Sequence, residues 1–313
     1  MKPNVYIDGK EGTTGLQIYD RLSGREDINL LLIDDDKRKD LTERKKYLNG
    51  ADIVFLCLPD GAAVEAVGLI DNPNTRVIDA STAHRTAAGW VYGFPELLAG
   101  QRQRIKFAKR VANPGCHATG FLSIVAPLVA MDILPKDYPV TCFSLTGYSG
   151  GGKKMIAEYE GDGKAEELYS PRIYGTGLKH KHLPEMQALS GLKYPPVFSP
   201  IVDDYYKGMA TGIQLHNALL KGKPTAQDIC ELLGRYYEDQ TMVRVAPWGS
   251  ETGMLAANAF SGYDNLEISV TGTGEQTLIV SRFDNLGKGA SGAAVQNMNL
   301  MLGLDETTGL AVK

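Results

Sequence analysis

The chain of 313 residues is 43% hydrophobic and 22% charged, which is the composition of a globular enzyme and excludes disordered and collagen-like proteins. Its net charge of -4 gives no basic surface of the kind that nucleic-acid binding requires. The start shows no signal-peptide pattern, and no apolar run approaches the roughly 20 residues that span a bilayer. We therefore expect a cytoplasmic protein with neither nucleic acid nor membrane as a partner.

The first 115 residues alternate between strand patterns and helix patterns. A β-rich segment at residues 4–8 leads into a glycine turn at 9–15 and then into helical apolar spacing at 16–22. Further apolar runs, typical of parallel strands covered on both faces, lie at residues 30–33, 52–59 and 76–80. We expect an α/β domain of the Rossmann type, with a doubly wound parallel sheet.

The pattern changes after residue 115. Strand-like segments of mostly alternating polarity, interspersed with helices, lie at residues 140–145, 212–219, 266–271 and 277–283. They indicate an α+β domain with a largely antiparallel sheet. A helix-compatible stretch at 289–303 is expected to return to the first domain, so the predicted domains are 1–115 with 289–313, and 116–288.

A glycine turn opens the first domain. Gly9, Gly12 and Gly15 follow the first strand and precede the first helix. Glycines at this point permit a tight turn and a close approach of the backbone to a pyrophosphate at the helix N-terminus. The motif alone is weak, and a plain structural turn is the alternative.

An acidic run follows the second strand. Asp34 lies about 20 residues after the glycine turn, where a carboxylate can accept the ribose hydroxyls of NAD. Lys37 and Arg38 could instead bind the 2′-phosphate of NADP. A solvated charged turn explains the run equally well, so the residues leave this choice open.

Cys116 differs from the other cysteines. Cys57, Cys142 and Cys230 lie in apolar surroundings, where cysteine is usually a small buried hydrophobic residue. Cys116 stands in the sequence NPGCHATG, just before an apolar helical segment. The unpaired N–H groups at a helix N-terminus stabilise a thiolate, which is the reactive nucleophile. A free cysteine in a helix cap is the alternative.

Two histidines lie in the sequence HKHLPE. His180 and His182 are two residues apart, so in an extended segment they face the same way. One could act as acid/base for Cys116 while the other contacts substrate. A zinc site lacks its third and fourth ligands, so we expect no metal. A solvated basic loop is the remaining alternative.

Two further motifs offer groups for anions. The sequence TGYSGGGKK, with Lys153, is a second glycine-rich turn that could hold phosphate or close over a nicotinamide, although it lacks the Walker spacing. The sequence DASTAHR follows the strand at 76–80, at a sheet edge where ligands of α/β domains bind. Its Arg85 is a candidate anion anchor, with a structural salt bridge as the alternative.

Taken in order, these motifs and the sequence DNLGKGASG near the C-terminus resemble the short form of the N-acetyl-gamma-glutamyl-phosphate reductase family of arginine biosynthesis. The resemblance covers residues 9–299. It implies a Rossmann domain closed by the C-terminal helix. It also implies a catalytic and dimerisation domain similar to those of aspartate-semialdehyde and glyceraldehyde-phosphate dehydrogenases, in a homodimer or homotetramer.

The resemblance also implies a mechanism. Cys116 would attack the acyl phosphate of N-acetyl-glutamyl 5-phosphate, and the resulting thioester would accept hydride from NADPH, giving the semialdehyde and phosphate. His182 would be the acid/base. The cofactor-binding residues would be Gly9, Gly12, Thr13, Gly15, Lys37, Arg38, Ser81, Ser149, Gly150 and Asn285. The substrate-binding residues would be Arg85, Asn113, Lys153, His180 and Glu185.

One departure concerns the cofactor. The family is generally linked to NADP, yet the run Asp34–Asp36 is acidic for a pocket that receives a 2′-phosphate. We predict that NADP is preferred, that Lys37 or Arg38 contacts the phosphate, and that Asp34 turns away.

Three rival functions share part of this pattern. A reductase of aspartyl or aminoadipyl phosphate would differ only in its acyl pocket. A cysteine hydrolase or acyltransferase could use Cys116 and His182, but it would leave the glycine turn unexplained. A non-catalytic dinucleotide sensor would need neither residue.

Overall fold

Parallel strands joined by helices make up the N-terminal part of the computed structural model, which describes residues 2–251 and 253–313. The strands lie in the order β2-β1-β3-β4-β6-β5, and every neighbouring pair is parallel. Their bounds are β1 (Asn4–Asp8), β2 (Asn29–Leu31), β3 (Ile53–Leu56), β4 (Arg76–Asp79), β5 (Val91–Tyr92) and β6 (Arg110–Ala112). The chain reverses its direction of progress across the sheet at β1, as in a doubly wound fold.

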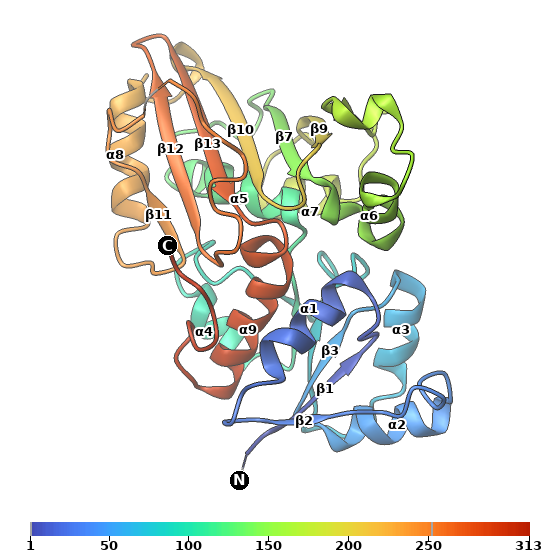
Figure 1. The fold of residues 1–313 in the computed structure, drawn as a ribbon. Coiled ribbons are helices and arrows are strands. Elements are labelled where there is room, and N and C mark those ends of the chain that lie inside the picture. The colour runs from blue at the N-terminus through green and yellow to red at the C-terminus, as the bar shows by residue number, and fades with distance from the viewer. Residues whose placement is uncertain (1, 252) are drawn as a thin grey trace. The chain divides into compact units, whose positions relative to one another are not determined.

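Helices cover both faces of this sheet (Figure 1). Ile18, Ile105 and Met298 belong to the core on one face, whereas Leu48 and Ala63 belong to the core on the other. The helices concerned are α1 (Thr13–Leu22), α4 (Gln101–Phe107) and α9 (Gly292–Leu302) on the first face, and α2 (Leu41–Gly50) and α3 (Asp60–Gly68) on the second. The C-terminal helix therefore returns to the N-terminal sheet, and the predicted Rossmann-type fold is confirmed.

The second sheet is mixed and has the order β11-β12-β13-β10-β7-β9-β8. The pairs β7·β9 and β11·β12 are parallel, and the others are antiparallel. Its strands are β7 (Thr141–Gly147), β8 (Arg172–Ile173), β9 (Val197–Asp203), β10 (Met209–His216), β11 (Val243–Val245), β12 (Leu266–Gly272) and β13 (Gln276–Phe283). The prediction of a largely antiparallel sheet is confirmed.

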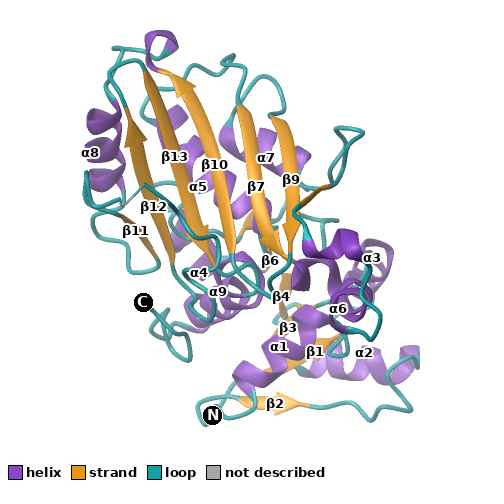
Figure 2. Cartoon of the chain, turned by 45° about the horizontal axis from the view of Figure 1, so that its top comes forward, coloured by secondary structure: helices purple, strands orange, loops and turns teal. Residues whose placement is uncertain are grey.

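Helices lie behind this second sheet in Figure 2. They are α5 (Cys116–Ala130), α7 (Leu183–Ser190) and α8 (Ala226–Tyr236). Helix α6 (Gly152–Glu160) lies beside the sheet, and the short helical turns are η1 (Tyr148–Gly151), η2 (Glu166–Tyr169), η3 (Asn217–Leu219) and η4 (Gly287–Ser291). Residues 117–128 of α5 are all buried, because a helix that is apolar on every side belongs in a core.

The chain forms two compact units. The first comprises residues up to Pro95, Gly100–Pro114 and Ala290–Leu310, and the second comprises Glu96–Ala99, Gly115–Gly289 and Ala311–Lys313. The short segments 96–99 and 311–313 thus belong to the second unit. Within the described residues, no helix is long and apolar enough to cross a membrane.

Candidate active site

Cys116 is the first residue of α5. Gly115 precedes it in extended conformation, and no described side chain caps the first turn of this helix. The N–H groups of that turn lack partners within the helix, and the positive end of the helix dipole lies beside the thiol. Cys116 is partly exposed, whereas burial raises the pKa of Cys57, Cys142 and Cys230. The place of Cys116 at the helix start, and the raised pKa of the other three thiols, favour it as the candidate reactive thiol.

Glu185 connects the start of α5 with His182. One carboxylate oxygen accepts a hydrogen bond of 3.2 Å from the N–H of Gly115. The other lies 4.0 Å from Nε2 of His182, and both side chains are at most 5% exposed. His182 caps α7 and Glu185 stands in the first turn of that helix, so the helix itself sets their spacing. The sequence predicted Glu185 as a substrate-binding residue, and in the structure its buried carboxylate lies between Gly115 and His182.

His117 adds a third imidazole to the site. Its ring centroid lies 5.4 Å from that of His180 and 5.7 Å from that of His182. The rings of His180 and His182 are 4.7 Å apart. His117 directly follows Cys116. Tyr174, which lies near Cys116, has its ring centroid 6.0 Å from that of His180. The predicted histidines of HKHLPE and the predicted cysteine therefore lie in the same part of the second unit.

A buried chain of hydrogen bonds holds His117. Its Nδ1 is 2.8 Å from the hydroxyl of Ser144, and that hydroxyl is 2.8 Å from the hydroxyl of Thr211. Its Nε2 is 2.6 Å from the hydroxyl of Tyr174. Burial, assisted by His180 and Lys181, lowers the pKa of His117 to about 3, so the ring is neutral at pH 7.

Tyr174 also belongs to this site. Burial first, and then the nearby Cys116, raises the pKa of its hydroxyl. Sequence reasoning missed Tyr174 and the role of His117. His117 stands within the NPGCHATG motif and could have been noted there, whereas Tyr174 stands in no recognisable motif.

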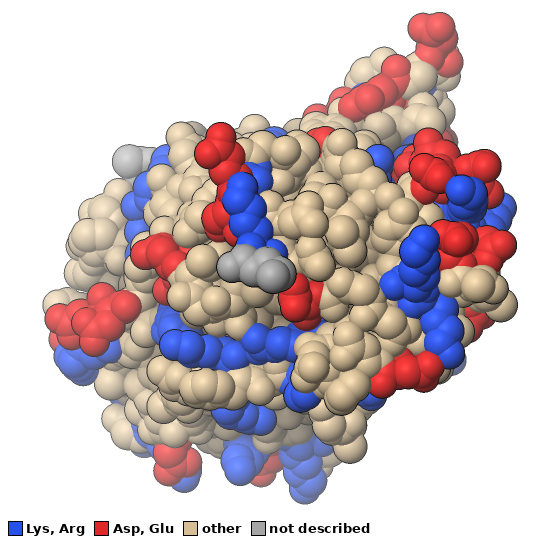
Figure 3. All heavy atoms as spheres, turned by 90° about the horizontal axis from the view of Figure 1, so that it is seen from below, with Lys and Arg blue, Asp and Glu red and all other residues tan. Residues whose placement is uncertain are grey.

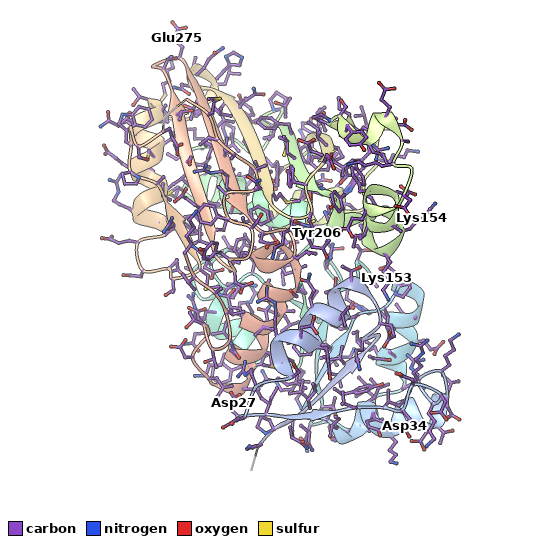
Figure 4. All side chains as sticks on the ribbon, viewed as in Figure 1. Asp27, Asp34, Lys153, Lys154, Tyr206 and Glu275 are labelled. Atoms are coloured by element: carbon purple, nitrogen blue, oxygen red, sulfur yellow. The ribbon has the colours of Figure 1, made fainter. Side chains whose placement is uncertain are left out.

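The second glycine-rich turn meets the loop after β13. Nδ2 of Asn285 donates to the hydroxyl of Ser149 over 3.0 Å, and Oδ1 of Asn285 accepts from the N–H of Gly208 over 2.9 Å. Gly150 lies next to this contact, because a Cβ atom there would be 3.5 Å from Nδ2 of Asn285. The structure thus brings together Ser149, Gly150 and Asn285, which the sequence assigned to the cofactor. Lys153 and Lys154 are exposed on α6 and extend in different directions (Figure 4).

The first unit holds the predicted pyrophosphate turn. Gly9 has a φ of +88°, and a side chain there would strike the carbonyl oxygen of Cys57. A side chain at Gly15 would strike the carbonyl oxygen of Gly9. Gly12 precedes α1, whose first turn, starting with Thr13, has no cap from any described side chain. The turn therefore requires glycine, and the open N–H groups of α1 fit a pyrophosphate.

The two cations of the charged run after β2, Lys37 and Arg38, pair with different carboxylates. Nζ of Lys37 lies 3.0 Å from a carboxylate oxygen of Asp34, which is labelled in Figure 4. Nη1 of Arg38 lies 3.9 Å from a carboxylate oxygen of Glu11, inside the glycine turn. Arg38 is thus the cation that reaches the turn.

The DASTAHR motif forms a compact network after β4. Asp79 accepts from the hydroxyl of Ser81 over 2.7 Å, and its carboxylate is 2.6 Å from Nδ1 of His84. Arg85 donates to the carbonyl oxygens of Asn113 and Ala80 over 3.0 and 3.3 Å. These contacts gather Ser81, Arg85 and Asn113 at the carboxyl ends of β4 and β6, which is the ligand-binding edge of such sheets.

Comparison with known proteins identifies the family. The semialdehyde dehydrogenase NAD-binding domain matches residues 4–106, and the semialdehyde dehydrogenase dimerisation domain matches residues 116–285. N-acetyl-gamma-glutamyl-phosphate reductase 2 of a Nostoc species is 48% identical, over 99% of each chain. The chain belongs to the N-acetyl-gamma-glutamyl-phosphate reductase family. The reductase of Brucella anthropi, another member, is 48% identical over 97% of this chain and 99% of its own.

Solved structures support the fold of the family. Aspartate semialdehyde dehydrogenase II of Vibrio cholerae superposes with a TM-score of 0.72 at 15% identity, over 96% of this chain and 99% of its own. The Francisella tularensis enzyme superposes equally well at 14% identity, with coverages of 96% and 100%. Membership of the family confirms the predicted oxidoreductase with a nicotinamide dinucleotide as cofactor. The match to a dimerisation domain supports an oligomer with a small-molecule substrate.

Proposed function

We propose that this chain reduces N-acetyl-glutamyl 5-phosphate to N-acetyl-glutamate 5-semialdehyde and phosphate, through a thioester on Cys116. One observation carries the proposal. The N-terminus of α5 bears the thiol, and Glu185 connects that N-terminus to His182 through contacts of 3.2 and 4.0 Å. This arrangement supports a site in which a thiol and an imidazole act together, as acyl transfer requires. The relatives that share nearly the full length bear the name of this activity.

Cys116 performs the first half of the reaction. Its thiolate attacks the carbonyl carbon of the acyl phosphate, the C–O bond to phosphate breaks, and a thioester remains. The N–H groups in the first turn of α5 stabilise both the thiolate and the negative charge that develops nearby.

His182 performs the proton transfers of the second half. When bound, NADPH supplies a hydride to the thioester carbon. The imidazolium of His182 protonates the resulting oxyanion, giving a thiohemiacetal. It then takes back the hydroxyl proton as the C–S bond breaks, which releases the aldehyde and restores the Cys116 thiolate. Glu185 holds the imidazole in place through the contact described above, and His180 contacts the substrate.

The site for the pyrophosphate and the 2′-phosphate lies in the first unit. Gly9, Gly12, Thr13 and Gly15 hold the pyrophosphate, because the turn fits it in shape and in N–H groups. The nicotinamide end of the cofactor is bound by Ser81, Ser149, Gly150 and Asn285. We assign the 2′-phosphate of NADP to Arg38 rather than Lys37, because Arg38 reaches the glycine turn and Lys37 is paired with Asp34. A guanidinium also suits bidentate phosphate binding.

The substrate's phosphate and carboxylate meet the remaining predicted residues. Lys153 is an exposed cation at the start of α6, next to the second glycine-rich turn. Arg85 and Asn113 lie at the carboxyl edge of the first sheet, where their contacts with backbone and with Asn297 orient them. Their contact with substrate remains part of the proposal.

The protein works as a homodimer or homotetramer in the cytoplasm. The face of the second sheet opposite α5 carries a cavity of about 620 Å³, lined by apolar strand residues such as Phe143, Leu145 and Leu278. Because this domain matches a dimerisation domain, we expect a second copy of the chain to pack against this apolar sheet face. All four cysteines are thiols, as is typical of a reducing compartment.

The reverse reaction tests this function. Phosphate-dependent reduction of NADP is followed by absorbance with the semialdehydes of N-acetyl-glutamate, aspartate and aminoadipate. We expect the N-acetyl-glutamate compound to give the highest kcat/KM, and no reaction without phosphate or arsenate.

Cys116→Ser is the matched variant for this assay. It should bind NADPH normally and lose several orders of magnitude in turnover, because a hydroxyl is a far weaker nucleophile at neutral pH. Preference for another semialdehyde would refute the substrate, and normal turnover of the serine variant would refute the thioester route.

A further inference from the structure

A fully buried ion pair lies in the second unit, outside the groups used so far. Nζ of Lys288 is 2.8 Å from Oε2 of Glu96, and the two side chains are 1% and 0% exposed. Removing two charges from water is costly, and apolar side chains of similar volume often stabilise a core equally well. Stability alone therefore does not explain this ion pair, and the residues next to Lys288 suggest another role.

Lys288 lies in η4, a turn with π-helical hydrogen bonding. Such turns are rare and are frequent at functional sites. The N–H groups of Gly287 and Gly289 both donate to the carbonyl oxygen of Asp284 over 3.1 Å. The carboxylate of Asp284 in turn accepts from the N–H of Gly262 over 2.6 Å. Hydrogen bonds to Asp284 therefore restrain the backbone on both sides of Lys288, and the ion pair with Glu96 restrains the Lys288 side chain.

Gly289 lies directly against the nucleophile. A Cβ atom at this position would be 2.9 Å from Cβ of Cys116 and 3.2 Å from the carbonyl oxygen of Asp284. The first separation is closer than real Cβ atoms approach, so the Gly289 backbone occupies the space beside Cys116. Because protein interiors are close-packed, a displacement of this turn changes the room that the Cys116 side chain has.

We propose that the Glu96–Lys288 ion pair is a positioning device for the nucleophile. By fixing Lys288, it holds the neighbouring Gly289 against Cys116 and so keeps Sγ in the orientation from which it attacks. Glu96 and Lys288 act through Gly289 and are positioning residues. The inference rests on the proposed function, since it takes Cys116 as the attacking group.

A double variant separates positioning from stability. Lys288→Met alone leaves the Glu96 carboxylate buried without its cation and risks unfolding, so Glu96→Leu and Lys288→Met are combined. The rate of alkylation of Cys116 by iodoacetamide, identified by mass spectrometry, is measured from pH 6 to 9 together with kcat and KM. We expect a folded protein in which alkylation and kcat both fall by about tenfold or more while KM changes little, as for a misplaced reacting group.

The control replaces another ion pair of the same unit in the same way. Arg282 and Glu267, on β13 and β12, are 2.8 Å apart and 12% and 13% exposed. Arg282→Met with Glu267→Leu should leave the alkylation rate of Cys116 unchanged. A folded Glu96→Leu, Lys288→Met protein with the alkylation rate and kcat of the wild type would overturn the proposal.

Gly289→Ala tests the contact itself if the double variant does not fold. The added methyl group meets Cys116, so alkylation and kcat should fall. Gly234→Ala in α8, where a Cβ atom would meet nothing within 4 Å, is its control. Wild-type alkylation in Gly289→Ala would also overturn the proposal. Alkylation reports the position of Cys116 even if Cys116→Ser shows that another group is the nucleophile, so the two failures are distinguishable.

Discussion

Glu185 shows how one carboxylate can serve two neighbours. Its two oxygens face Gly115, at the N-terminus of α5, and His182. Any shift of α7 would therefore move His182 and break the hydrogen bond from Gly115 together. Sequence spacing could reveal that Glu185 follows His182 by one helical turn, but not that Gly115 lies opposite.

The roles of the two histidines can be separated by kinetics. His182→Ala should lose roughly 10²–10⁴ in kcat, because a positioned proton-transfer group contributes that much. His180→Ala should act mainly on KM. Steady-state rates at saturating NADP measure both.

His117 does not contribute to pH profiles of this site near neutrality. Burial holds its pKa at about 3, so it does not titrate where the enzyme would be assayed. A basic or acidic limb near neutrality that disappears in His182→Ala would assign the titration to His182. A profile that stays the same in that variant, or a loss of kcat in His180→Ala alone, would reverse the assigned roles.

At the level of elements, the glycine turn and the loop after β2 decide the choice of cofactor. We expect Arg38→Ala to reduce kcat/KM for NADP by about tenfold or more and to leave that for NAD nearly unchanged, since a bidentate charge-assisted contact is lost. Lys37→Ala is the matched control, because Lys37 is equally exposed and pairs with Asp34. Parallel titrations with both cofactors measure the change. Equal effects of the two substitutions, or preference of the wild type for NAD, would contradict the assignment.

Sequence patterns predicted an element or a site residue best where all the residues of the pattern are close together in the chain. The strand, glycine turn and helix at the start, and Cys116 beside an apolar helix, follow from spacing and composition. Pro184 indicated a helix start after HKH, where α7 begins, whereas the strand at 197–203 had no clear pattern. His117, Ser144, Thr211 and Tyr174 meet only because α5 packs against β7 and β10, and such long-range pairings leave no mark on neighbouring residues.

At the scale of the whole molecule, acidic and basic side chains are interspersed on the face drawn in Figure 3, in keeping with the net charge of -4. A net charge of this size gives only modest repulsion between copies of the chain, so the proposed oligomer can form through apolar contact. The sheet face with the cavity is the place to test this.

Leu278→Lys should convert the oligomer to smaller species. The side chain lines the apolar cavity on the sheet face, and a buried ammonium without a partner is costly at an interface. Sedimentation velocity of wild type and variant measures the change. Glu275→Lys, at the exposed tip of the same hairpin (Figure 4), is the control. An unchanged sedimentation coefficient for Leu278→Lys would place the interface elsewhere.

Most of the second unit is inserted into the first between Pro114 and Ala290, and this has a consequence for synthesis on the ribosome. Val295 and Met298 of α9 belong to the core of the N-terminal sheet. The part of this sheet face that α9 covers therefore stays open to water until that helix has left the exit tunnel. Domains usually fold as units in the order of their synthesis, but here the nucleotide-binding unit is begun first and is completed only after most of the second unit has been made. Until α9 packs onto this sheet, its exposed apolar side chains make the nascent chain prone to aggregation.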